Sequence, residues 1–149
     1  SSANSLAGDF SVVLFGYRSD FTNTLVVGKK PSSSQQQLMD LAKLAMNAGE
    51  NNLLDGVNAS HVYQSVMGVF LKAGFGEHFP HHAGHGLGLS HPEAPFIVPG
   101  SDEILVAGDV ITLEPGLYVP NVGGLRIERN YLITESGFEC LTHHNISLV

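Results

Sequence analysis

One short stretch of this chain concentrates side chains that could bind a metal. Between His78 and Pro95 the sequence reads HFPHHAGHGLGLSHPEAP, which holds five of the eight histidines. A neutral imidazole is the commonest metal ligand in proteins, and it titrates near neutral pH. Glycines on both sides of His85 and the prolines that follow predict an extended or looped backbone that can pass close to another segment. The stretch therefore indicates either a metal site or a polar, glycine-rich bend, and carboxylates elsewhere must decide between them.

Two familiar motifs do not account for this stretch. The run GHGLG resembles a phosphate-binding loop, but the dinucleotide fingerprint needs a different spacing and a helix directly after it, which Pro92 and Pro95 prevent. His81 and His85 have the spacing of the two zinc ligands in a zincin, but no glutamate follows His81. We therefore set both motifs aside.

Two aspartates lie in a predicted β-hairpin. Residues 9–28 read DFSVVLFGYRSDFTNTLVVG, where β-branched and aromatic residues dominate and Gly16 breaks the run in the middle. If the loop near Phe15 and Gly16 has two or four residues, the numbers of any two residues that face each other across the hairpin add up to an odd value. The numbers of Asp9 and Asp20 do so, and the two side chains should therefore project from the same face. Two such carboxylates repel unless a cation or proton lies between them. The alternative is a pair of unrelated edge or turn aspartates.

Two glutamates also lie in predicted strands. Residues 109–114 alternate in polarity and end on Glu114, and residues 125–134 form a strand that places Arg126 and Glu128 on one face. A glutamate that is buried without a partner is costly. Each glutamate therefore marks either a solvated face of the sheet or a functional site.

Two helices are predicted between these strands. Ser32 to Ser34 can cap the first helix, whose apolar residues follow a helical period up to Gly49, a plausible C-terminal stop. Asn58 or Ser60 can cap the second helix, and Gly74 ends it.

Composition limits the classes of function. The 149 residues suit one domain, and a net charge of −7 argues against a nucleic-acid partner. No apolar run approaches the roughly 20 residues of a membrane span, so we expect no membrane partner. The first eight residues, SSANSLAG, lack the features of a signal peptide. The single cysteine, Cys140, excludes an internal disulfide framework and predicts a reducing, cytoplasmic location.

Five polar residues now stand out: Asp9, Asp20, His85, Glu114 and Glu128. Four carboxylates and one imidazole suit Mn²⁺, Fe²⁺, Co²⁺ or Zn²⁺ and carry enough negative charge for two divalent ions. The chain resembles the pita-bread metallopeptidases, which include prolidase, aminopeptidase P and methionine aminopeptidase. The resemblance lies in the order of these five residues along the chain and in the runs GYRSD, HHAGHGLGL, PEAP, TLEPGLY and GGLRIE. The resemblance covers essentially the whole chain.

The resemblance implies an α+β pita-bread (creatinase/aminopeptidase) fold with a curved antiparallel sheet covered by helices. Residues 1–149 would be the C-terminal part of the catalytic domain, because members have several dozen further residues before this point, and the fragment alone need not be active. Only 14% of the residues are charged, against about 25% in an average domain, which fits apolar surface covered by that missing part. The full-length protein is expected to be a homodimer, as family members often are.

The resemblance also implies roles for the five residues and two metal ions, with Mn²⁺ expected first and Co²⁺, Zn²⁺ or Fe²⁺ as alternatives. Asp9 would chelate one ion, His85 and Glu114 would hold the other, and Asp20 and Glu128 would bridge them. A hydroxide between the metals would attack the scissile carbonyl of a small peptide, with Glu114 as the proton shuttle.

Four further residues receive roles from the same resemblance. His81 and His91 would contact the substrate and stabilise the tetrahedral intermediate, while Tyr118 and Arg126 would orient Asp9 and the substrate pocket. The runs TLEPGLYVPNVGGLRIE and PHHAGHGLGL are most similar to the Xaa-Pro peptidases. That subfamily implies a dipeptidase or aminopeptidase that cleaves between an N-terminal residue and a following proline.

One departure from the family pattern leaves alternatives open. Many members have a second histidine seven residues after the ligand histidine, but here Pro92 takes that position and His91 is one residue earlier. A one-residue shift turns a strand side chain to the other face, so either a β-bulge returns His91 to the pocket or its role is lost. The second hypothesis is therefore a small-amide hydrolase of the creatinase-like type. The third is a non-catalytic peptide-binding module, against which the intact set of five ligands argues.

Overall fold

The N-terminal part of the chain is a long β-hairpin. A computed structural model describes residues 4–149, so residues 1–3 of the segment considered as a signal peptide lie outside the described residues. The strands of the hairpin are β1 (Asn4–Phe10), β2 (Val13–Leu14), β3 (Tyr17–Arg18) and β4 (Phe21–Val27). β1 pairs with β4, β2 pairs with β3, and the loop is Phe15 and Gly16, with φ angles of 51° and 89° as a type I′ turn requires. Asp9 faces Thr22, which confirms the odd-sum register and puts Asp9 on the same face as Asp20.

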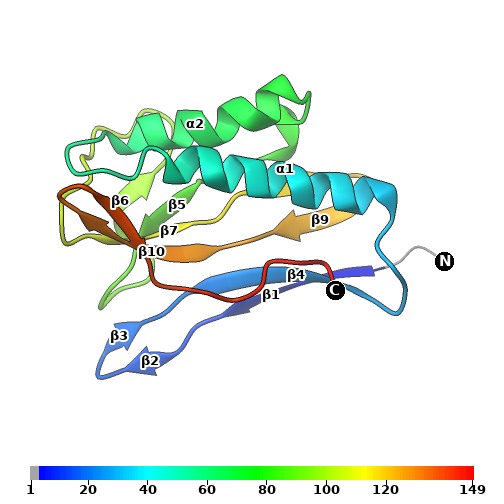
Figure 1. Ribbon diagram of the computed structural model, residues 1–149, viewed down its shortest axis with the longest axis horizontal. Coiled ribbons are helices and arrows are strands. Elements are labelled where there is room, and N and C mark those ends of the chain that lie inside the picture. Colours follow the sequence, from blue (N-terminus) through cyan, green and yellow to red (C-terminus); the bar gives the residue numbers. More distant parts are fainter. Residues whose placement is uncertain (1–3) are drawn as a thin grey trace.

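Two helices follow the hairpin and lie side by side over the strands (Figure 1). They are α1 (Ser33–Glu50) and α2 (Ala59–Lys72), followed by the short 3₁₀ helix η1 (Gly76–His78). The predicted caps are confirmed: Ser32 caps α1, and the Asn58 side chain accepts a hydrogen bond from the backbone of Ser60 at α2. Gly74 follows α2 with a φ of 79°, as predicted for its end. Neither helix is apolar over enough of its length to cross a membrane.

The predicted stop of the first helix at Gly49 is wrong. α1 continues to Glu50 and is capped by Asn51. A Cβ on Gly49 would lie 2.9 Å from Cδ1 of Leu113 and 3.0 Å from Cγ2 of Val66. Gly49 is therefore a close-packing position inside the helix rather than its end.

The strands after the helices form a five-stranded antiparallel sheet in the order β11-β10-β7-β5-β6. Its strands are β5 (Gly84–Gly86), β6 (Glu93–Ile97), β7 (Val110–Leu113), β10 (Arg129–Thr134) and β11 (Gly137–Cys140). A separate hairpin is formed by β8 (Gly116–Val119) and β9 (Gly123–Arg126), which the sequence analysis did not anticipate.

The prediction of one continuous strand over residues 125–134 is wrong. β9 pairs with β8, β10 pairs with β7, and between them the backbone N–H of Glu128 donates to the carbonyl of Thr22 in β4, at 2.9 Å. The chain changes its pairing partner twice here, so Glu128 leaves the regular ladder and lies beside the N-terminal hairpin.

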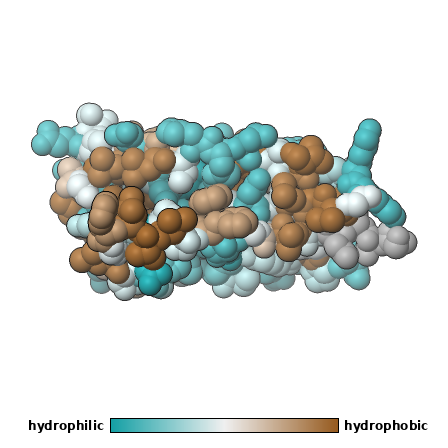
Figure 2. Space-filling view, turned by 90° about the horizontal axis from the view of Figure 1, so that it is seen from below, coloured by the Kyte–Doolittle hydropathy of each residue, from teal (hydrophilic) through white to brown (hydrophobic). Residues whose placement is uncertain are grey.

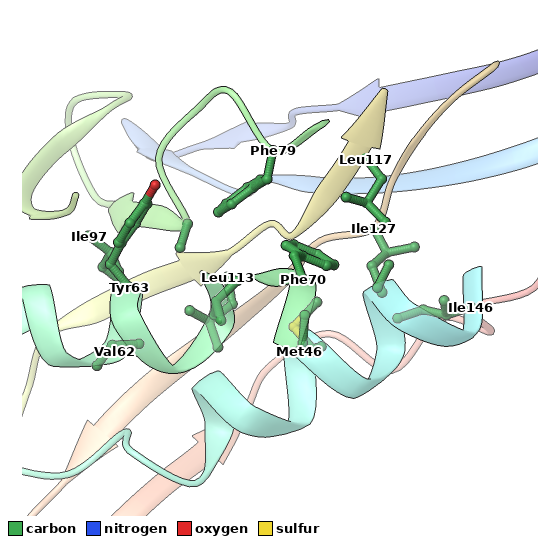
Figure 3. Packing of buried hydrophobic residues seen from close by; sticks show 14 of the residues in the cluster. Met46, Val62, Tyr63, Phe70, Phe79, Ile97, Leu113, Leu117, Ile127 and Ile146 are labelled. Carbon is green, nitrogen blue, oxygen red and sulfur yellow. The ribbon is translucent and has the colours of Figure 1, made fainter. Parts of the chain in front are cut away.

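The core lies between the helices and the strands (Figure 3). Met46 of α1 and Phe70 of α2 pack with strand-side residues that include Leu113 and Ile127, and all four are buried. Full burial of a large apolar side chain stabilises a fold by roughly 1.5–3 kcal/mol. Because Leu113 and Ile127 point into this core, the residues that follow them, Glu114 and Glu128, can point away from it.

Apolar side chains also remain exposed on the face of the N-terminal hairpin (Figure 2). Phe15 at the hairpin tip is 93% exposed, and Leu6, Phe10 and Leu25 are also exposed. This apolar surface is consistent with the prediction, from the low charge content, that another segment or subunit covers part of the chain.

Two glycines let the backbone strands around His85 approach each other closely. A Cβ on Gly84 would lie 1.9 Å from the carbonyl oxygen of Thr112, and one on Gly86 would lie 2.0 Å from that of Ala94. The sequence predicted that another segment passes close to the backbone around His85. The segments that do so are the neighbouring strands β6 and β7.

We predict that Gly84→Ala lowers the free energy of unfolding by on the order of 3–5 kcal/mol, because the clash is with backbone that cannot move without breaking the sheet. A Cβ on Gly68 in α2 would have no atom within 4 Å beyond its chain neighbours and the backbone of its own helix. Gly68→Ala is therefore the matched control, and it should raise the free energy of unfolding by about 0.5–1 kcal/mol. Urea denaturation of the purified variants measures both values. Equal stability of the two variants would contradict the packing described here.

Candidate metal centre

Carboxylates and imidazoles from strands far apart in the sequence meet at one place. Three groups of side chains each bring their ligand atoms within 4.8 Å of one another. The groups are Asp9, Asp20 and Glu128; Asp20, His85 and His91; and His82, His85 and Glu114. Asp20 and His85 are each shared by two groups, so the three form one continuous cluster. The cluster contains all five residues that the resemblance implied as metal ligands.

One side of the cluster offers only oxygen atoms. The Thr22 hydroxyl donates to Oε2 of Glu128 at 2.6 Å, and Nη2 of Arg126 donates to Oδ2 of Asp9 at 2.6 Å. Two further oxygens of this side, Oδ1 of Asp20 and Oε1 of Glu128, are buried and have no hydrogen-bond partner among the described residues. Buried oxygens without a partner are rare and costly, so both are open positions for a cation.

The charges on this side call for compensation. Burial, and after it the nearby Glu114 carboxylate, raises the pKa of Glu128 to about 9. Burial also raises the pKa of Asp9, and the neighbouring Asp20 carboxylate raises it further. Without a cation Glu128 would hold a proton at neutral pH, and a divalent ion would take the place of that proton. The donor atoms and their charges therefore fit a metal ion.

The other side of the cluster is rich in nitrogen. Nδ1–H of His85 donates a hydrogen bond to the carbonyl oxygen of Gly86, at 2.8 Å, which leaves Nε2 without a proton and free as a ligand. That Nε2 is 3.4 Å from Oε1 of Glu114 and 3.7 Å from Oδ2 of Asp20. His85 therefore faces the two carboxylates that the resemblance placed around it.

His82 also lies in the cluster, although the sequence analysis passed over it. Its Nε2 is 2.9 Å from Oε1 of Glu114. This hydrogen bond raises the pKa of His82. Burial alone would raise the pKa of Glu114, but the hydrogen bond from His82 and the charges of His82 and His85 lower it overall. No periodicity marked His82, because it precedes β5 in an irregular segment where side-chain direction follows no repeat.

His81 takes a different position from its neighbour. Its Nδ1 lies 2.7 Å from the carbonyl oxygen of His82, and its ring is 5.5 Å from the ring of Tyr118. Its Nε2 is buried without a hydrogen-bond partner in the described structure, and burial lowers its pKa. His81 is thus a neutral imidazole packed beside Tyr118, outside the three groups.

His91 faces the cluster despite its shifted position in the sequence. Its Nε2 contacts Oδ2 of Asp20. The pairing of β5 with β6 is irregular: His85 lies opposite Phe96, but Gly86 lies opposite Glu93. The sequence left two alternatives: a β-bulge that returns His91 to the pocket, or the loss of its role. The structure has the irregular strand pairing, and the His91 imidazole lies beside the cluster.

Thr22 and Arg126 complete the surroundings of the cluster. Thr22 was not singled out from the sequence, yet it is fully buried, and the side chain of Arg126 lies within 3.3–3.4 Å of its hydroxyl. Its signal was available, because Thr22 stands two residues after Asp20 and so shares its face in a strand. Arg126 contacts Asp9, as the resemblance implied.

Comparisons with known proteins bear on the family and the fold of this chain. The model of metallopeptidase family M24 matches residues 3–135. An uncharacterized peptidase of Staphylococcus haemolyticus is 39% identical over 137 residues, which are 92% of this chain and 39% of that protein. The prolidase from Pyrococcus horikoshii OT3 has a TM-score of 0.93 at 32% identity, covering 99% of this chain and 42% of the prolidase. The Xaa-Pro dipeptidase from Bacillus anthracis has a TM-score of 0.91 at 34% identity, covering 96% of this chain and 40% of the dipeptidase.

These matches confirm the predicted α+β pita-bread fold. The chain spans about two-fifths of the length of the relatives it matches.

The raised pKa of Glu128 predicts a pH-dependent stability in metal-free protein. Folded Glu128 keeps its proton up to about pH 9, whereas an unfolded glutamate releases it near its ordinary pKa of 4.5. The free energy of unfolding should therefore fall as the pH rises from about 5 to about 9. Glu128→Gln should flatten this slope, while Glu139→Gln on the exposed strand β11 should not. Urea denaturation in the presence of a chelator measures the slope, and an unchanged slope in Glu128→Gln would contradict the assignment.

Proposed function

This chain belongs to metallopeptidase family M24, and we propose that it supplies the metal-binding part of a peptidase that cleaves between an N-terminal residue and a following proline. One observation carries the proposal: five donor side chains converge, and two buried carboxylate oxygens among them lack a hydrogen-bond partner within residues 4–149. The specificity for proline rests on similarity to solved structures of a prolidase and an Xaa-Pro dipeptidase.

The proposed ligand sets follow the positions of the donor atoms. Asp9 would hold one ion, His85 and Glu114 would hold the other, and Asp20 and Glu128 would bridge them. Asp20 groups both with Asp9 and Glu128 and with His85, which supports its part in this proposal. Two divalent ions bound there would supply a water of lowered pKa as the nucleophile and a Lewis acid for the scissile carbonyl. Mn²⁺ suits the oxygen donors of Asp9, Asp20 and Glu128.

Glu114 is the proposed proton carrier. Its pKa is lowered, because the hydrogen bond from His82 and the charges of His82 and His85 outweigh the effect of burial. Glu114 is therefore ionised near neutral pH, so that it can accept a proton from the attacking water and return it to the leaving amine. Its hydrogen bond with His82 fixes the orientation of the carboxylate.

The substrate would approach from the exposed rim of the cluster. His91 and Tyr118 are both partly exposed, at 31% of the side chain and 38% of the residue. In this proposal they contact the substrate together with His81, whose ring packs beside that of Tyr118, while Arg126 holds Asp9 in place.

We also propose that the complete protein is a cytoplasmic homodimer. The proposed location rests on the single cysteine, Cys140, which forms no disulfide. The proposed dimer rests on the family, whose members are often homodimers. Size-exclusion chromatography of the full-length protein measures the oligomeric state.

Replacing the proton carrier should strongly lower the turnover rate with little effect on the fold. Glu114→Gln in the full-length protein should lower kcat for Xaa-Pro dipeptides by roughly 10²–10⁴-fold, because the amide cannot carry the proton. Glu139→Gln should leave kcat unchanged. Assays on Xaa-Pro dipeptides, Xaa-Ala dipeptides and non-peptide amides, with added Mn²⁺, measure the effect.

The same panel separates the proposal from its alternatives. Turnover of non-peptide amides alone would favour the small-amide hydrolase. Tight peptide binding without turnover would favour the binding module. Wild-type kcat in Glu114→Gln would contradict the proposed role of Glu114.

A further inference from the structure

A pocket of about 500 Å³ lies between α1 and the C-terminal tail, residues 141–149, which runs along that helix (Figure 1). It is lined by three residues of α1, by Ile127 and Arg129, and by four residues of the tail. No residue grouped above as a possible metal ligand lines it, although Ile127 and Arg129 stand on either side of Glu128 in the chain. The pocket is therefore a feature separate from the metal cluster.

The lining of this pocket carries positive charge. Lys43 and Arg129 are two of only seven lysines and arginines in a chain with fourteen acidic residues, and no aspartate or glutamate of residues 4–149 lines the pocket. Burial lowers the pKa of His144, and the charge of Arg129 lowers it further, so this imidazole is neutral near pH 7. The permanent charge thus comes from Lys43 and Arg129, and a cationic hollow on an acidic protein attracts anions.

The guanidinium of Arg129 is left with unused donors. Its Nε is buried and has no hydrogen-bond partner in the described part of the chain. Its Nη1 is 3.9 Å from Oε1 of Glu50, which is too far for a hydrogen bond, and that oxygen already accepts one from the Tyr131 hydroxyl at 2.7 Å. A buried N–H without an acceptor is rare and costly, so Arg129 is suited to an added anionic partner.

The floor of the pocket is apolar. Met46, Ile127 and Ile146 line it, are buried, and lie close together (Figure 3). Asn47 and Asn145 add exposed amide groups at the rim. The volume falls within the roughly 300–1,000 Å³ of small-molecule sites, which combine an apolar lining with a few polar groups. A fitting ligand has an anionic group for the two cations and an apolar part for the floor.

We propose that this pocket binds a small organic anion, a phosphate monoester or a carboxylate. Its charged group pairs with Arg129 and Lys43, and its apolar part lies on Met46, Ile127 and Ile146. The planar guanidinium can donate two parallel hydrogen bonds to a phosphate or a carboxylate, and the lysine adds a point charge. This inference goes beyond the proposed peptidase function and does not rest on it.

Isothermal titration calorimetry of the full-length protein tests the proposal with two probes, phenyl phosphate and benzoate. Phenol, the same ring without an anionic group, is the neutral control. We expect a Kd of about 0.1–1 mM for at least one of the two anions and no measurable binding of phenol. The tighter of the two probes identifies the preferred anionic group. Protein that has been treated with a chelator and desalted should give the same Kd, because no metal ion takes part.

Two substitutions locate the binding. Arg129→Gln should weaken binding of the tighter probe by about 10–100-fold, and Lys43→Gln, at a half-buried position that leaves the core intact, by about 3–10-fold. The matched control is Lys72→Gln, an exposed lysine in the last turn of α2, which should leave the Kd unchanged.

Three results would overturn this inference. They are no binding of either anion, binding of phenol as tight as that of the anions, and a wild-type Kd in either Arg129→Gln or Lys43→Gln. Each of them leaves the proposed peptidase function standing, because that function is tested by turnover of Xaa-Pro dipeptides.

Discussion

Four carboxylates share one partly buried site in this fold, and their mutual repulsion is the constraint on which the rest of the structure depends. Two unit charges 4 Å apart repel by about 4 kcal/mol at the effective dielectric constant of a protein. Arg126 neutralises part of this charge at Asp9, and His82 part of it at Glu114. Oδ1 of Asp20 and Oε1 of Glu128 are buried and have no such partner among the described residues. A proton or a divalent cation must complete the balance.

The fold holds these charges together by burying apolar residues on the opposite side. Leu113 and Ile127 are fully buried beneath the helices, and each directly precedes a glutamate of the cluster. The type I′ turn sets the register that puts Asp9 and Asp20 on one face. Gly84 and Gly86 let neighbouring strands close around His85. Each donor is thus positioned by packing that would exist without a metal, which reduces the cost of binding one.

The parts of the structure that follow from local rules were predictable from the sequence. The odd sum of facing residue numbers sufficed to predict the register of the hairpin. The capping side chains of Ser32 and Asn58 sufficed to predict where both helices begin. Gly49 was wrongly predicted to end the first helix. A glycine is needed there because the helix packs closely against Leu113, which lies far along the chain. The break at Glu128 depends on a hydrogen bond to Thr22, more than a hundred residues away. Such long-range partners leave no local pattern.

The candidate site divides in the same way. Asp9, Asp20 and Glu114 could be found because a carboxylate within an apolar alternation is conspicuous. The directions of His82 and His91 could not, since one precedes a strand and the other depends on an irregular strand pairing.

Anomalous diffraction from metal-loaded crystals of the full-length protein tests the central claim most directly. The account predicts two anomalous peaks, each at about 2.0–2.3 Å from donor atoms of Asp9, Asp20, His85, Glu114 and Glu128. Peaks elsewhere, or no peak among these five side chains, would contradict it.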